Sequence, residues 1–349
     1  MHPRCHGTCC RNDMSPGTEQ RLRSVEANRP KGGLLRHGRA YDGAMGGVDR
    51  DCDAGTAVLA ALSAISRRLD ELESPALADD PDAVHQLRTH VRRLRSVLAA
   101  YEPLFDAAVV RALRRRYREL GRELGTVRDL EVRLQAARRS LEKAREAGDL
   151  DPAELEVSRA RLIDEDVEAH RLAHARFVER QRMPRATERR TALTEFLTET
   201  PLMPEADEPA RPVLARLLER EARRAVRRAS RASASTDLER LHAARKAGRR
   251  LRYAAEAVID EPVALFGDAA QELADAGKAL HDVLGDHRDQ MLFAEYMRRA
   301  AAHAAHAGGP AHALEQLDPA ADEPLADRPP GFDHAVRALR RAARSWSSR

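Results

Sequence analysis

Apolar residues recur at spacings of three and four along almost the whole chain from Gly55 onward. This period is typical of amphipathic α-helices, and no stretch shows the strict alternation of a half-buried strand. The pattern therefore predicts an all-α protein. The first series of predicted helices runs through Val58–Leu72, then from after Pro81–Asp82 to near Pro103, then over 107–124, 127–147 and 152–181, and ends with a short helix that stops at Thr200. The second series lies at 213–231, 237–259, 262–284, 287–306 and 333–346.

Three stretches interrupt this pattern. Residues 1–50 are rich in Arg, Gly, His and Pro without apolar periodicity, which predicts a disordered tail or a true start at Met14 or Met45. Four prolines among acidic residues mark 201–212 as a linker, and glycine and prolines break the pattern again between Gly308 and Gly331. We therefore expect a dispensable tail at 1–50 and a helical domain at 54–347, with a first half at 54–200 and a second half at 213–347.

Two motifs occur once in each half. The pattern H-x-x-R-x-x-x-R-R-L-R occupies residues 85–95 and returns at 242–252. The pattern L-G-x-x-R-D occupies 124–129 and returns at 284–289. Two motifs repeated in the same order indicate an internal duplication of a helical bundle of about 140 residues.

The first motif places its basic residues in an unusual position on the helix. At about 100° per residue these side chains share an arc of roughly 80°, and the apolar positions fall on a second arc centred about 100° away. The basic stripe thus lies beside the buried face, where it would line a groove or channel between packed helices. No acidic residue occurs from His85 to Tyr101 or from Leu241 to Ala255, so an anionic partner is expected. The stripe consists of His85, Arg88, Arg92 and Arg95.

The second motif has an ordinary structural interpretation. Its glycine would close one helix in a left-handed cap, and Thr126 or Asp286 would begin the next helix, with an acidic residue three positions on as in a capping box. This does not explain the arginine just inside a helix N-terminus, where its charge opposes the helix dipole. Arg128 and Arg288 are therefore candidates for ligand contact.

At these motifs the chain resembles the CHAD family, the conserved histidine α-helical domain, over roughly residues 54–347. The resemblance implies two pseudo-symmetric four-helix bundles around a basic channel that binds inorganic polyphosphate, often on polyphosphate granules. Because the sequence shows no catalytic or metal-site motif, we expect no catalytic residue, no cofactor and no metal. His281 stands where relatives often have Gln. The polyphosphate-binding candidates are His85, Arg88, Arg92, Arg93, Arg95, Arg128, His242, Arg245, Lys246, Arg249, Arg250, Arg252 and Arg288.

The chemistry of the candidate residues fits this ligand. Polyphosphate carries about one negative charge per phosphate and presents no bases, and the planar guanidinium of Arg can bridge phosphate oxygens. His85 and His242 could contact such a ligand or could be packed, hydrogen-bonded core residues. Their surroundings in the sequence do not match a metal site, nor do the spacings of Cys5, Cys9 and Cys10 near the start of the chain.

Two other functions stay open at this point. A polyphosphate-processing enzyme or other phosphohydrolase would need features that the sequence lacks, a phosphate-binding loop and clustered metal carboxylates. A nucleic-acid-binding protein is disfavoured by an aromatic content of 3% and a net charge of only +4. No apolar segment resembles a signal peptide or a membrane helix, so we expect a cytoplasmic protein that does not engage membranes.

Overall fold

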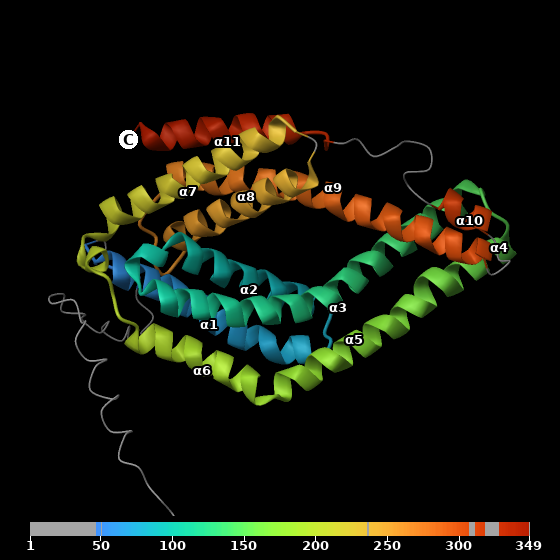
Figure 1. Ribbon diagram of the computed structural model, residues 1–349, viewed down its shortest axis with the longest axis horizontal. Coiled ribbons are helices and arrows are strands. Elements are labelled where there is room, and N and C mark those ends of the chain that lie inside the picture. Colours follow the sequence, from blue (N-terminus) through green and yellow to red (C-terminus); the bar gives the residue numbers. More distant parts are fainter. Residues whose placement is uncertain (1–46, 50, 236, 307–310, 318–327, 349) are drawn as a thin grey trace, which may run out of the picture. The chain divides into compact units, whose positions relative to one another are not determined.

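The computed structural model describes residues 47–49, 51–235, 237–306, 311–317 and 328–348, so that of the predicted tail at 1–50 all but residues 47–49 lies outside this range. The described part is helical and contains no strand, as the sequence predicts (Figure 1). Its α-helices are α1 (Ala54–Leu77), α2 (Ala83–Ala100), α3 (Ala107–Ala147), α4 (Pro152–Arg159), α5 (Glu165–Arg182), α6 (Pro184–Glu199), α7 (Ala210–Ser233), α8 (Leu238–Ile259), α9 (Asp268–His306), α10 (Ala311–Gln316) and α11 (Phe332–Ser347).

Local signals in the sequence set many of these boundaries. The carboxylate of Asp53 accepts a hydrogen bond from the Thr56 amide at 2.7 Å at the start of α1, and Asp237 accepts one from the Glu239 amide at 2.8 Å at the start of α8. Pro184 separates α5 from α6 where the sequence predicts a stop. The predicted helix at 152–181 is a continuous stretch in which a π-helical turn, 160–164, joins α4 to α5.

The prediction of a helix boundary at the second motif is wrong in both halves. α3 runs unbroken from 107 to 147 and α9 from 268 to 306, each through its L-G-x-x-R-D sequence. Gly125 and Gly285 are helical and do not form left-handed caps, because the described glycines with positive φ are Gly148 and Gly331. A glycine inside a helix costs about 1 kcal/mol relative to alanine, so neither residue is there for helix stability.

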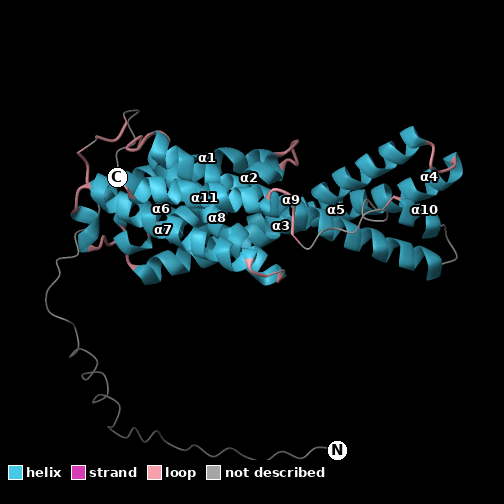
Figure 2. Cartoon of the chain, turned by 90° about the horizontal axis from the view of Figure 1, so that it is seen from above, coloured by secondary structure: helices cyan, strands magenta, loops and turns pink. Residues whose placement is uncertain are grey.

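Most of the helices share one hydrophobic core. It is built from α1, α2 and α3 together with α7, α8, α9 and α11, and its largest fully buried side chains include Tyr101, Phe105 and Phe332. A second apolar cluster joins the far ends of α3 and α9 to α4 and α10, around Leu162 and Met297. Figure 2 shows these far ends extending away from the main group of helices.

The two helices that carry the first motif, α2 and α8, contact each other within the core. The Tyr101 hydroxyl, just after α2, donates a hydrogen bond to the Ala254 carbonyl of α8 at 2.7 Å. α8 in turn packs against α9 with almost no gap, because a Cβ added at Gly248 would lie 2.9 Å from the Gly277 carbonyl oxygen. The motif helices are therefore held in fixed positions by the core.

Two segments outside the long helices differ from simple loops. The predicted linker 201–212 packs on the core, where the Met203 amide donates to the Leu104 carbonyl at 3.0 Å and Ala206 is fully buried. The short helix α10 lies within the predicted break before Gly331, and residues 318–327 of that break lie outside the described range. None of the described helices is both long and apolar enough to span a bilayer.

Candidate anion-binding site

Arginines from the two motif helices come together in one cluster. Arg92 lies on α2 and Arg249 on α8, and the charge of Arg92 lowers the pKa of Arg249. Burial is the larger cause for both residues, and together the effects lower the pKa of Arg92 to about 10 and that of Arg249 to about 9. Arg245 of α8 acts on both. Residues 157 positions apart in the sequence thus share one electrostatic environment.

We call Arg92, Arg95, Arg245 and Arg249 the arginine cluster, and these four side chains have few protein partners. In the described part of the chain, none of them forms an ion pair with a carboxylate. Their Nε atoms are buried without a hydrogen-bond partner. Asp289 on α9 opposes part of the repulsion at Arg92 and Arg245.

The glycines of the second motif lie against arginines of the first. A Cβ added at Gly125 would lie 3.7 Å from Nη2 of Arg88, and one added at Gly285 would lie 3.2 Å from Nη2 of Arg245. The two halves therefore repeat the same contact between a motif glycine on a long helix and a motif arginine on its neighbour. Close approach of the guanidinium, and not a helix cap, explains glycine at position 285, whereas a Cβ at position 125 would make ordinary van der Waals contact.

His281 on α9 completes the cluster as a hydrogen-bond acceptor. Its Nε2 lies 2.6 Å from Nη2 of Arg92, which donates. Burial first, and then Arg92, Arg245 and Arg249, lower the pKa of His281 to about 4. The imidazole is consequently neutral at pH 7, as an acceptor for a guanidinium must be.

The motif histidines lie at the edge of the cluster. His85 is partly buried, and its pKa is lowered by burial and then by Arg128. His242 is exposed, and its pKa is lowered by burial and then by Lys246 and Arg288. Each histidine is therefore neutral at pH 7 and lies next to the arginine of the second motif in its own half.

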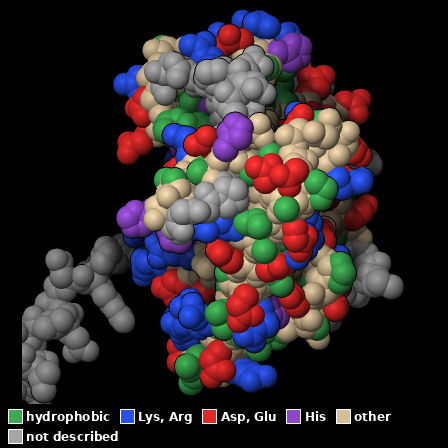
Figure 3. Space-filling model, turned by 90° about the vertical axis from the view of Figure 1, so that its right-hand side faces the viewer, with side chains coloured by type: hydrophobic (Ala, Val, Ile, Leu, Met, Phe, Trp, Pro, Cys, Tyr) green, Lys and Arg blue, Asp and Glu red, His purple; other side chains and the backbone are tan. Residues whose placement is uncertain are grey.

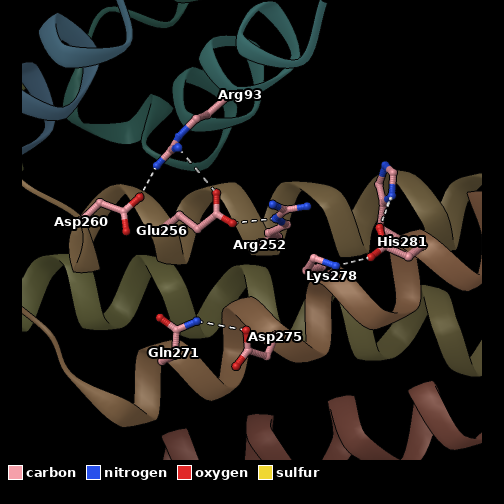
Figure 4. A network of polar contacts seen from close by, with 9 residues as sticks. Arg93, Arg252, Glu256, Asp260, Gln271, Asp275, Lys278 and His281 are labelled. Atoms are coloured by element: carbon pink, nitrogen blue, oxygen red, sulfur yellow. Dashed lines mark hydrogen bonds and ion pairs between the residues drawn. The ribbon is translucent and has the colours of Figure 1, made fainter. Parts of the chain in front are cut away.

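Other predicted site residues are held by carboxylates. Arg93 pairs with Asp260 at 2.5 Å, and Arg252 pairs with Glu256 at 2.6 Å (Figure 4). On the other side of the α2–α8 contact, Arg250 bonds the buried Glu221 at 2.5 Å and the Ala99 carbonyl. Arg93 and Arg250 thus connect α8 and the residue after it to α2 and α7, Arg252 pairs within α8, and the structure does not bring these three arginines into the arginine cluster.

The remaining predicted residues differ in whether a carboxylate lies close to them or they are exposed at a hollow. Arg128 pairs with Glu131 at 2.8 Å, and Arg88 lies 3.8 Å from Asp129. Lys246 and Arg288 are exposed at a hollow of about 1190 Å³ between α8 and α9, which His242 and Arg245 also line. This hollow adjoins the arginine cluster, because Arg245 belongs to both.

The sequence interpretation missed a further basic stripe on α3. Burial and the charges of Arg118, Arg114 and Arg122 lower the pKa of Arg95 to about 10, and Arg118 also acts on Lys246. These three arginines are spaced by four residues, so they follow one face of the helix. That spacing is the signal that could have identified them.

Another face of the molecule gives a contrast to the arginine cluster. On the face at the far ends of α3, α5 and α9, basic and acidic side chains are interspersed (Figure 3). In the arginine cluster no described carboxylate forms an ion pair, and Asp289 offsets the repulsion only in part. Fixed, partly dehydrated guanidinium groups without carboxylates are suited to hold several anionic oxygens at once.

A known family and two curated proteins are similar to this chain in sequence. A family model described as the CHAD domain matches residues 60–298. Uncharacterized proteins of Mycobacterium tuberculosis, MT2285 of strain CDC 1551 and Rv2226 of strain H37Rv, are each 27% identical over 256 residues, or 70% of this chain. The chain spans about half the length of these curated relatives, 46% of each.

Two solved structures share the fold. The crystal structure of the CHAD domain from the plant Ricinus communis aligns with a TM-score of 0.61 and 22% identity, covering 87% of this chain and 96% of that one. PptA from Streptomyces chartreusis aligns with a TM-score of 0.59 and 22% identity, covering 85% of this chain and 100% of that one.

Proposed function

The chain belongs to the CHAD domain family, and from that premise we propose that it binds inorganic polyphosphate without consuming it. The single observation that carries the proposal is the arginine cluster, in which guanidinium groups of α2 and α8 are partly buried, repel one another and have no carboxylate partner. Such an arrangement is unfavourable in the free protein. An anion that lies among these groups would relieve the repulsion and would satisfy the buried Nε donors.

Polyphosphate suits this cluster better than other polyanions do. It carries about one charge per phosphate along a thin, flexible chain, so consecutive phosphates can meet arginines from both helices. A nucleic acid would bring bases as well, and proteins that bind single strands usually supply aromatic platforms for them. The aromatic content here is 3%, and Tyr253, the aromatic residue that acts on Arg92 and Arg249, is buried and is not exposed for a base to stack on.

We propose a binding role without catalysis because the groups at the cluster suit holding phosphate. Phosphoryl transfer to water requires a positioned nucleophile and in most enzymes a metal held by carboxylates. Of the groups at the cluster, His281 is already engaged by Arg92 at 2.6 Å. We further propose that the protein is cytoplasmic and associates with polyphosphate granules through this binding.

A competition experiment tests the proposal. The full chain should be retained on immobilised long-chain polyphosphate, and soluble long polyphosphate should release it at much lower phosphate concentration than RNA or short phosphates. The matched control carries Arg337→Ala and Arg341→Ala on the exposed face of α11, which removes two charges away from the cluster. This α11 control should bind like the wild type.

A second arm tests the absence of catalysis. Polyphosphate incubated with the protein and Mg²⁺ or Mn²⁺ should keep its length on a gel. Shortening at a rate proportional to the protein concentration would contradict the non-catalytic role, and equal release by RNA would contradict the choice of ligand.

A further inference from the structure

Three side chains from separate segments meet beside the start of α2. Asp79 lies in the turn between α1 and α2, Glu131 lies on α3, and His170 lies on α5. Each offers one possible ligand atom, and these atoms all lie within 4.8 Å of one another. Nδ1 of His170 is 3.8 Å from Oδ2 of Asp79, and Nε2 of His170 is 3.7 Å from Oε1 of Glu131.

Both contacts have the length of ion pairs, but they are too long for hydrogen bonds. Nε2 of His170 is buried and has no hydrogen-bond partner. A buried ring nitrogen that faces a carboxylate oxygen without bonding it is costly unless another group lies between them. A single cation binds only one ring nitrogen, and a cation held by Nε2 of His170 and by one oxygen of each carboxylate would satisfy all three groups.

Surrounding contacts already orient the cluster. Arg128 bonds Oε2 of Glu131 at 2.8 Å, which leaves Oε1 toward His170. The ring of His174 stacks on that of His170 at 6.3 Å, and its Nε2 donates to the Ala76 carbonyl at 2.9 Å beside the turn that holds Asp79. Partners of this kind fix ligand direction around metal ions in proteins.

We propose that Asp79, Glu131 and His170 form a binding site for a divalent transition-metal ion such as Zn²⁺. One imidazole nitrogen with two carboxylate oxygens favours this class over Mg²⁺ and Ca²⁺, which prefer oxygen ligands alone. With metal–ligand distances of about 2.0–2.2 Å and tetrahedral angles, the ligand atoms would lie about 3.3 Å apart. The side chains therefore need to move inward by an ångström or less, and the fourth position is left for water.

The site would connect the α1–α2 turn to α3 and α5. A bound ion should thus stabilise the folded chain, since a ligand that binds only the native state raises its stability. The proposal does not depend on polyphosphate, and all its tests are made without that ligand, which itself binds metals.

Metal titration of the full chain tests the site. Zn²⁺ should bind by calorimetry and raise the melting temperature, and Co²⁺ should give visible d–d absorption. His170→Ala and Asp79→Asn should each lose one equivalent of Zn²⁺ or bind it at least about 100-fold more weakly, because even the loss of a residue behind a ligand weakens binding by 10- to 100-fold. Asn is chosen at position 79 because the backbone there has φ of 60°, which Asn tolerates.

The matched control is His334→Ala, which removes an exposed histidine from α11. Any Zn²⁺ held by the cysteines and histidines near the start of the chain is present in every variant, and Co²⁺ at such sulfur ligands is recognised by thiolate charge-transfer absorption. Loss of one equivalent without thiolate character in both site variants, with the control unchanged, supports the site. Equal Zn²⁺ binding and equal thermal stabilisation in the wild type, His170→Ala and Asp79→Asn would overturn it, and Asp79→Asn alone decides the case if the histidine variant does not fold.

Discussion

The two motif glycines offer a matched pair of substitutions that separates stability from binding. In Gly285→Ala the new methyl group would lie 3.2 Å from Nη2 and 3.4 Å from Nε of Arg245, closer than most Cβ contacts, so the guanidinium must shift by a few tenths of an ångström. In Gly125→Ala the nearest atoms of Arg88 lie at 3.7 and 3.8 Å, which is ordinary van der Waals contact. Both positions lie inside long helices.

The two substitutions should differ in their effects on the free energy of unfolding and on polyphosphate affinity. Alanine in place of glycine inside a helix stabilises by roughly 0.5–1 kcal/mol, so Gly125→Ala should raise the free energy of unfolding by about that amount. Gly285→Ala should gain little or nothing in stability, because crowding of Arg245 offsets the gain. A hydrogen bond to a charged group contributes about 1.5–3 kcal/mol, so displacement of Arg245 should weaken polyphosphate binding by about 10-fold or more.

Urea unfolding and calorimetric titration with polyphosphate of defined length measure the two effects on the same samples. Gly125→Ala should keep the wild-type Kd, and Gly285→Ala should bind more weakly while it stays folded. The reasoning would be refuted if Gly285→Ala bound like the wild type, or if both variants lost affinity equally, since the contact distances then would not govern the position of Arg245.

Further predictions separate the roles of individual side chains at the cluster. Because the pKa of His281 is lowered from 6.5 to about 4, the unfolded chain binds more protons between these pH values, so the free energy of unfolding should fall as pH drops from 6.5 to 4, by about 3 kcal/mol at most. His281→Gln, which still accepts a hydrogen bond from Arg92, should give a flatter urea-unfolding profile over this range; an unchanged slope would show that another group titrates. Arg250→Ala leaves the buried carboxylate of Glu221 without its close partner and should destabilise by about 3 kcal/mol or more in the same assay. Arg249→Met removes a charge with no carboxylate partner and keeps the apolar stem, so stability should stay level or rise while polyphosphate affinity falls; a large loss of stability would mean that this guanidinium has a structural partner.

The helices and the basic stripe could be predicted because their causes are local. Helical periodicity, proline stops such as Pro184 and the Asp237 cap act within a few residues, and the structure follows them. The angle between the basic and apolar arcs on α2 is likewise a property of one helix. It places Arg92 partly buried beside the fully buried Val91 and Leu94.

The boundary at the second motif was predicted wrongly because local signals were ambiguous. A glycine between helical stretches can end a helix or can admit a close neighbour, and the sequence around Gly125 and Gly285 fits both. The choice depends on Arg88 and Arg245, which approach from other helices. Only the tertiary structure shows that contact.

The sequence interpretation did not identify the carboxylates that pair with the predicted arginines, and several partners in the structure lie far apart in the sequence. The acid-free stretch ends at Ala255, one residue before Glu256, which pairs with Arg252 and could have been recognised by its spacing of four. Asp260, the partner of Arg93, comes from the other half of the chain and carries no such signal. The proposed metal ligands likewise come from three separate segments and form no spacing motif.

In the proposed binding mode, α2 and α8 both bind the same polyphosphate chain. Calorimetric titration with polyphosphate of defined length tests it most directly, on the wild type, on Arg88→Ala with Arg92→Ala, and on Arg245→Ala with Arg249→Ala. One class of sites is expected, and each double variant should weaken binding by several kcal/mol without a change in stoichiometry. The dependence of log Kd on salt should also become smaller in each double variant, while the α11 control should stay close to the wild type. Two separable sites in the wild type, with a different one lost in each double variant, would contradict it.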